Sequence, residues 1–181
     1  MLKQISVKGF KSLVDVRLDL PRLVVLAGPN AAGKSNVLDA IQMLSRAGTQ
    51  RTLGDALNDP IRGFPAEAFT LPSGGLPELL ETRTARFSIG ADLEIPGGSG
   101  AIDRVRYRMG VDIDPDAGVL SLADEYLART ANDWEQKGNA RIETVDGEIH
   151  VRRTGGGGAP RHEPLGVNHT YLSDTRLSGA S

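Results

Sequence analysis

The chain has 181 residues and a formal net charge of −2, with 39% hydrophobic and 24% charged residues, a balance typical of one folded domain and unlike that of a disordered chain. It contains no cysteine, which excludes disulfides, thiol catalysis and cysteine-based zinc sites. No apolar run is long enough to cross a bilayer and the first residues lack the apolar core of a signal peptide, so we expect a cytoplasmic protein without a membrane partner.

Three segments with strand patterns precede the first glycine-rich stretch. Residues 2–9 and 13–20 alternate apolar and polar side chains with the period of two that half-buried strands show, and we expect them to pair antiparallel. Residues 23–27 are apolar throughout, which predicts a strand covered on both faces inside an α/β layer. Pro21 separates the two kinds of strand.

A phosphate-binding loop pattern, G-x4-G-K-[ST], follows this run as Gly28-Pro29-Asn30-Ala31-Ala32-Gly33-Lys34-Ser35. The two glycines allow backbone conformations in which successive N–H groups point inward around a phosphate. Lys34 is placed to reach the β- and γ-phosphate oxygens, and Ser35 to ligate Mg²⁺ beside the N-terminus of the next helix. The pattern therefore predicts a nucleoside triphosphate with Mg²⁺ as the ligand.

Helical spacing of apolar residues from Asn36 to Ala47 predicts the helix that such a loop requires, with Gly48 as its end. Residues 49–77 show no period among their glycines and prolines, which predicts an irregular insertion. A short helical turn is expected at 77–82.

The second half of the chain has the pattern of an antiparallel β meander. Alternation predicts strands at 85–95 and 105–113, a return strand at 119–122 and then a short helix at 123–132. Further on, Asp146-Gly147 is a two-residue hairpin signal between strands. We place these strands at 140–145 and 148–153, followed by a flexible link at 155–160 and a last strand at 167–172.

The expected organisation has four parts. They are a strand-loop-helix core at 1–48, the irregular insertion at 49–82, an antiparallel meander of the same lobe at 83–153, and the link with the last strand at 154–181.

Three N-terminal segments, Ile5–Ser12, Val14–Leu20 and Val24–Ile41, carry a likeness to a known family. They resemble the N-terminal lobe of SMC/RecF/OLD-type ABC ATPases, a group that includes AAA-like ATPases, and Asn30 and Asn36 sharpen the resemblance. The fold class it implies is α/β, or α+β overall: a P-loop NTPase lobe with a mixed sheet and an antiparallel β subdomain.

The resemblance implies ATP and Mg²⁺ as cofactors, held by Gly28 to Asn36, with Lys34 at the β- and γ-phosphates and Ser35 on the metal. It also implies that Lys11, with Ser12 next to it, lies beside the nucleotide. Heads of this kind hydrolyse ATP when two copies sandwich two nucleotides, so a homodimer is expected in the ATP state. DNA or an effector nuclease is the further partner implied, in DNA repair or metabolism or in antiphage defence.

Hydrolysis in this family requires a carboxylate pair at the end of an apolar strand and a serine-glycine signature. Leu120–Glu125 mimics the carboxylate motif and makes Glu125 a catalytic candidate, although a helix start at this point would make the acidic pair an ordinary one. Leu177–Ser181 echoes the signature, and Tyr171–Asp174 resembles the strand end at which relatives place a glutamine that contacts Mg²⁺. We expect an N-terminal portion of a larger ATPase, without its C-terminal lobe, that binds ATP with little or no turnover.

Two other functions share the loop. One is a small-molecule P-loop kinase, although kinases have further parallel strands joined by helices, which the alternation over 85–153 does not favour. The other is a non-catalytic clamp whose dimerisation is gated by ATP.

Side chains outside the loop predict no second site. The three histidines, His150, His162 and His169, lack metal-ligand spacing. A stripe of arginines on one strand face fits a solvated surface better than it fits a nucleic-acid backbone; its members are Arg104, Arg106 and Arg108.

Overall fold

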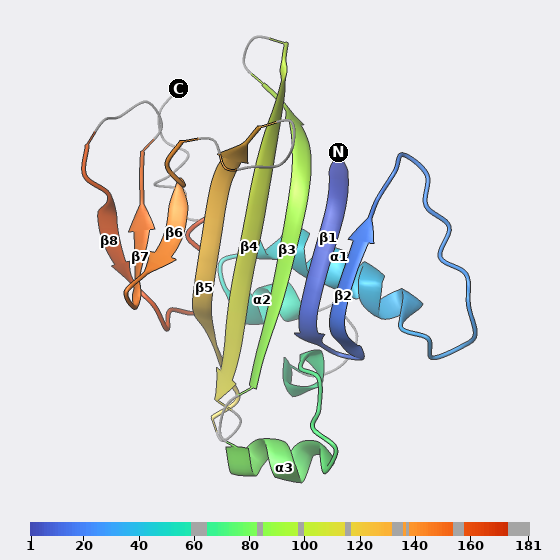
Figure 1. The fold of residues 1–181 in the computed structure, drawn as a ribbon. Helices are drawn as coiled ribbons and strands as arrows, with labels where there is room; N and C mark the ends of the chain where they lie inside the picture. The colour runs from blue at the N-terminus through green and yellow to red at the C-terminus, as the bar shows by residue number, and fades with distance from the viewer. Residues whose placement is uncertain are drawn as a thin grey trace.

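The computed structural model describes residues 1–58, 65–82, 85–97, 100–114, 117–131, 136, 138–153 and 158–173. Within them, eight strands form one sheet in the order β2-β1-β3-β4-β5-β6-β7-β8, and adjacent strands are antiparallel throughout (Figure 1). The strands are β1 Leu2–Phe10, β2 Leu13–Asp19, β3 Ala85–Pro96, β4 Ile102–Asp114, β5 Val119–Thr130, β6 Ile142–Val145, β7 Glu148–Val151 and β8 Arg161–Pro164. The helices are α1 Lys34–Ala47, α2 Leu53–Leu57, the 3-10 turn η1 Pro65–Ala68 and α3 Gly75–Thr82.

The fold is therefore of the α+β type, with an antiparallel sheet. The mixed sheet expected from the sequence is wrong for the described part of the chain, because no strand there runs parallel to its neighbour. The division into four parts stays a prediction, and a single sheet runs through three of those parts.

The meander predicted from alternation is confirmed in its long strands β3 and β4. Every second side chain of these strands points to one face, and Phe87, Ile89 and Met109 are fully buried there. Helices α1 and α2 cover this face, behind the sheet in Figure 1. Their apolar stripes, with Ala40 and Leu53 among the buried residues, close the core.

The helix expected at 123–132 is wrong, because β5 continues as a strand to Thr130. A bulge is the reason. Leu122 pairs with Val111 and Asp124 with Gly110, so Ala123 is an extra residue in the ladder. The core-facing positions of β5 then change from even to odd residue numbers, and strict alternation, the signal for a strand, is lost from the sequence.

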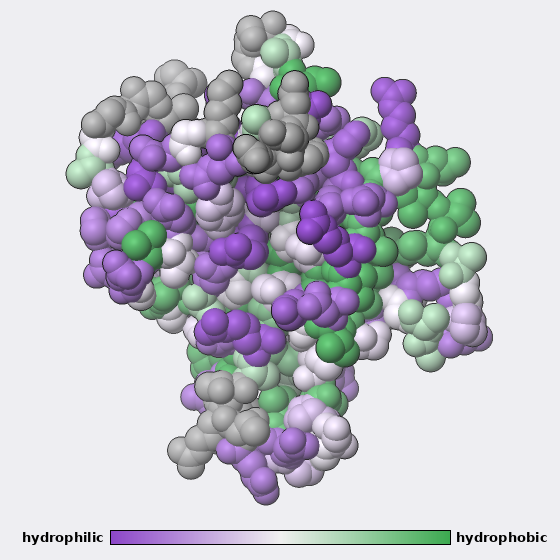
Figure 2. All heavy atoms as spheres, viewed as in Figure 1, coloured by the Kyte–Doolittle hydropathy of each residue, from purple (hydrophilic) through white to green (hydrophobic). Residues whose placement is uncertain are grey.

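The opposite face of the sheet is covered by cross-strand ion pairs. Arg106 donates to Asp92 through Nε and Nη2, at 2.7 and 2.8 Å, and Arg108 lies 2.7 Å from Asp124. Arg104 pairs with Glu94 at 3.2 Å. Figure 2 shows hydrophilic side chains gathered over the central strands on this face. The arginine stripe therefore pairs with carboxylates of the same sheet, which agrees with the solvated surface predicted from the sequence.

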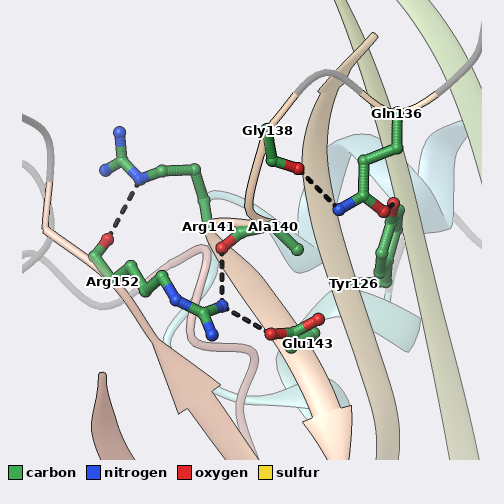
Figure 3. Close-up of polar contacts among 7 residues, drawn as sticks. All are labelled: Tyr126, Gln136, Gly138, Ala140, Arg141, Glu143 and Arg152. Carbon is green, nitrogen blue, oxygen red and sulfur yellow. Dashed lines mark hydrogen bonds and ion pairs between the residues drawn. The ribbon is translucent and has the colours of Figure 1, made fainter. Parts of the chain in front are cut away.

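The hairpin predicted at Asp146-Gly147 is confirmed between β6 and β7. Both turn residues have positive φ, 50° and 83°, as a two-residue turn of this kind needs. Side-chain hydrogen bonds stabilise the hairpin at its open end. Arg141 donates to the backbone carbonyl of Arg152, and Arg152 donates to the backbone carbonyl of Ala140 and to the carboxylate of Glu143 (Figure 3).

The last strand expected at 167–172 is wrong; residues 170–173 form a turn instead. Residues 167–170 bind three separate elements instead of pairing as a strand. Val167 O accepts from Leu122 N of β5, Asn168 O accepts from Leu53 N of α2, and Thr170 Oγ1 donates to Ala47 O of α1. Strand β8 was not predicted, and residues 155–157 of the flexible link expected at 155–160 lie outside the described residues. Among the described helices, none has the length and apolar character to cross a membrane.

Candidate phosphate-binding site

The glycine loop runs directly into α1 and carries backbone conformations that side chains rarely adopt. The φ angles of Gly28, Ala31 and Gly33 are 149°, 65° and 83°. The φ of Gly33 favours glycine, and a Cβ added there would also come within 3.1 Å of Ser12 Oγ. The backbone therefore turns sharply between Gly28 and Gly33 before α1 begins.

The start of α1 leaves its amide groups to a ligand. Gly33 is the residue before the helix and has no side chain to cap it, so the first-turn N–H groups lack the partner that a serine or aspartate would supply. A cavity of about 260 Å³ opens at this point, lined by residues Asn30–Asn36. Partial positive charge at the helix N-terminus and free amides around a small polar cavity are what an anion needs.

Lys34 points into the loop. Its Nζ donates to the backbone carbonyls of Gly28 and Pro29, at 2.8 and 2.6 Å. These bonds hold the ammonium group against the turn, beside the cavity that Lys34 and the exposed Ser35 help to line. The predicted phosphate contact and the predicted metal ligand thus lie together at one cavity.

The β1–β2 turn lies beside the first turns of α1. Asn36 Nδ2 donates to Ser12 Oγ at 2.7 Å, and Lys11 Nζ forms a largely buried ion pair with Asp39 at 2.6 Å. Lys11 has a φ of 51°. Its backbone N–H donates to Ala68 O, in addition to the ion pair that its side chain makes with α1. The ammonium group of Lys11 therefore lies against α1, and its expected place beside the nucleotide stays a prediction.

The strand predicted at 23–27 is wrong. These residues have no strand conformation, and Leu23 and Val25 are 81% and 80% exposed. The segment runs away from the sheet between β2 and α1 (Figure 1), and hydrophobic side chains gather on that side of the molecule in Figure 2. An apolar strand needs neighbours for its backbone and cover for its faces, and the described chain supplies neither here.

Glu125 does not lie at the predicted start of a helix; it lies within β5 and is 0% exposed. Its carboxylate accepts hydrogen bonds from Tyr107 Oη at 2.9 Å and from the backbone N–H groups of Tyr171 and Leu172 at 2.7 and 3.0 Å. Burial raises its pKa from the ordinary 4.5 to about 7, against the effect of these three donors. The geometry gives Glu125 a structural role, which is to hold the 170–173 turn against the sheet, and it supplies no support for a hydrolytic one.

Of the remaining predicted motifs, the described residue Ser173 lies in the 170–173 turn and does not line the phosphate cavity. Ser173 Oγ donates to Thr170 O within the turn, while Asp174 and Leu177–Ser181 lie outside the described residues. A larger cavity of about 610 Å³ lies between the C-terminal half of α1 and the sheet. Its lining is mostly apolar, with Leu44, Val105 and Leu127, and includes no residue of the glycine loop.

Similarity to known proteins places the chain among the ABC/AAA-like P-loop ATPases. Residues 23–176 match the family described as "AAA domain, putative AbiEii toxin, Type IV TA system", and the chain belongs to this family.

Three relatives are similar to the N-terminal part of the chain. It is 44% identical over 55 residues to the DNA replication and repair protein RecF of Lactococcus lactis subsp. cremoris (strain MG1363), covering 30% of this chain and 15% of the relative. It is 44% identical over 76 residues to the chromosome partition protein Smc of Desulfitobacterium hafniense (strain Y51), covering 40% and 6%. It is 46% identical over 44 residues to the OLD nuclease of Thermus scotoductus (strain ATCC 700910 / SA-01), covering 24% and 8%. The matches thus span only a small part of each relative.

Proposed function

We propose that the chain binds ATP with Mg²⁺ on the loop Gly28–Asn36 and is the N-terminal part of an ABC/SMC-like ATPase. The observation that carries the proposal is the glycine loop before the uncapped start of α1, with the Lys34 ammonium held inside the loop. The amides would bind the phosphate oxygens, Lys34 would replace its carbonyl partners with the β- and γ-phosphates, and Ser35 would ligate Mg²⁺. Magnesium with the triphosphate supplies charge neutralisation at the phosphates.

The exposed apolar segment supports the idea of a missing lobe. Residues 23–26 have the composition of a central strand and the exposure of a loop, with Leu23 and Val25 mostly in solvent. Strands of a C-terminal lobe on both sides of this segment would pair its backbone and bury its side chains. The same lobe would bring the carboxylates that hydrolysis needs, so the chain alone binds ATP with little or no turnover.

Dimerisation and DNA enter the proposal through the relatives. RecF and Smc are named for DNA repair and chromosome partition, and the OLD protein is named a nuclease. By this likeness, two copies of the complete protein sandwich two nucleotides and act on DNA or with a nuclease. Light scattering on the complete protein tests this, and a monomer with and without Mg-ATP contradicts it.

The antiparallel sheet favours an ABC/SMC-like ATPase over a small-molecule kinase, which needs parallel strands joined by helices.

Mg-ATP is expected to raise the melting temperature of the 181-residue chain. At a ligand concentration about 100 times the dissociation constant, binding stabilises the native state by about 2.7 kcal/mol. For a chain of this size that is a rise of roughly 5–10 °C. Lys34→Ala should abolish the rise, because the positive charge inside the loop is lost. Differential scanning calorimetry measures it.

Lys8→Ala is the matched control. Lys8 lies on β1 in an exposed ion pair with Asp15 at 3.2 Å, outside the loop, so this variant should keep the full shift. Equal shifts in the wild type and in Lys34→Ala would rule out the loop as the binding site.

A further inference from the structure

Strands β6, β7 and β8 align two histidines and two glutamates on one face of the sheet. The register pairs Glu143 with His150 and His150 with His162, so these side chains form a row across three strands. Glu148 lies two residues before His150 and therefore on the same face of β7. The intervening Ile149 is fully buried on the opposite face and anchors β7 to the core.

The side chains of this row are already in contact. The rings of His150 and His162 have centroids 4.3 Å apart, and His162 Nδ1 lies 2.8 Å from Glu148 Oε2. One ligand atom from each of Glu148, His150 and His162 lies within 4.8 Å of the other two. Donors on a tetrahedral zinc ion lie roughly 3.4 Å apart, for bond lengths of about 2.0–2.1 Å, so small side-chain rotations would close the set around an ion.

We propose that Glu148, His150 and His162 form a binding site for a divalent transition metal of the zinc type. Two imidazole nitrogens and one carboxylate oxygen are ligands that Zn²⁺ and Ni²⁺ take, whereas Mg²⁺ and Ca²⁺ prefer oxygen alone. Glu148 and His162 are exposed, so ions reach the site from solvent. Glu143 is engaged by Arg152 and is left out of the ligand set.

The site would act as a clip on the edge of the sheet. Strand β8 is four residues long and is bound to the sheet through β7 alone in the described structure. A metal held by two residues of β7 and one of β8 would link the two strands more strongly than the hydrogen bond between His162 and Glu148 does. The hydrogen bond between His162 and Glu148 keeps both ligands on the same side before the ion arrives and is exchanged for two metal bonds. This site is independent of the nucleotide loop.

Calorimetric titration of the 181-residue chain with ZnCl₂ tests the proposal, with MgCl₂ titrated in parallel. The expected result is one Zn²⁺ per chain and no binding of Mg²⁺ at the same concentration. His150→Ala and His162→Ala should each weaken Zn²⁺ binding at least about tenfold, because even the loss of a side chain that only orients a metal ligand typically costs ~10–100-fold in affinity. Glu148→Gln should weaken it less, since the histidines remain.

His169→Ala is the matched control. His169 is the third histidine of the chain and packs against Tyr171, outside the cluster, so its loss should leave Zn²⁺ binding unchanged. Lys34→Ala should also bind Zn²⁺ normally, which separates failure of this proposal from failure of the nucleotide site. Unchanged Zn²⁺ affinity in both His150→Ala and His162→Ala would overturn the proposal.

A second measurement does not depend on how the variants fold. Paramagnetic Ni²⁺ added in small amounts to the wild-type chain should broaden the imidazole NMR signals of His150 and His162 and leave those of His169 sharp. Equal broadening of all three signals would overturn the proposal.

Discussion

Glu125→Ala is expected to destabilise the chain by at least about 3 kcal/mol. The substitution removes the acceptor of three donors, the buried Tyr107 Oη and Tyr171 N–H and the part-buried Leu172 N–H, and each buried donor left unpaired costs about 1–3 kcal/mol. Urea unfolding followed by circular dichroism measures the loss. A loss below about 1 kcal/mol would mean that the 170–173 turn does not depend on this carboxylate.

The same carboxylate makes stability depend on pH. Because burial raises the pKa of Glu125 from 4.5 to about 7, the folded chain holds this proton to a higher pH than the unfolded chain does. Its stabilising effect is complete below about pH 4.5 and is lost as the pH rises through about 7. The stability of the wild type relative to Glu125→Gln should therefore fall by up to about 3 kcal/mol across this window. Asp15→Asn, at an exposed carboxylate outside this contact, is the control variant measured over the same pH range.

Phe87→Ala is expected to lower the free energy of unfolding by about 3–5 kcal/mol. Phe87 is 0% exposed, and its ring centroid lies 5.2 Å from that of Phe10 and 5.0 Å from that of Phe69. This aromatic cluster joins β1, β3 and the segment after η1, and truncation would leave a cavity among all three. The urea midpoint measures the effect.

Val119→Ala is the control for the aromatic cluster. Val119 is an exposed apolar residue at the start of β5, and its truncation should change stability by no more than about 0.5 kcal/mol. A comparable loss in both variants would show that the cluster does not carry the packing assigned to it.

Local sequence signals predicted the elements that depend on neighbours in the chain. Helix α1 and strands β1 to β4 follow from apolar periods, and the β6–β7 turn follows from Asp146-Gly147, whose residues adopt the positive φ that the turn needs. The unusual backbone conformations of the loop glycines Gly28 and Gly33 were also predicted from local sequence. Gly33 has the positive φ on which the phosphate-loop interpretation relies.

Sequence patterns did not predict the features that depend on residues distant along the chain. Residues 23–27 have the composition of a buried strand, but composition does not supply the neighbouring strands that would bury it. The bulge at Ala123 moves Glu125 into the core and breaks the alternation of β5. The pairing of His150 with His162 depends on the register of β7 and β8, which no spacing along the chain reveals.

The most direct test of the phosphate site is to follow the backbone amides of the ¹⁵N-labelled chain by NMR as Mg-ATP is added. If residues Gly28 to Asn36 form the phosphate cradle, the largest chemical-shift changes will fall on their amides, with Gly33, Lys34 and Ser35 among them. Changes centred instead on Gly48 and Thr49, beside the apolar cavity at the other end of α1, or no changes at all, would contradict the account.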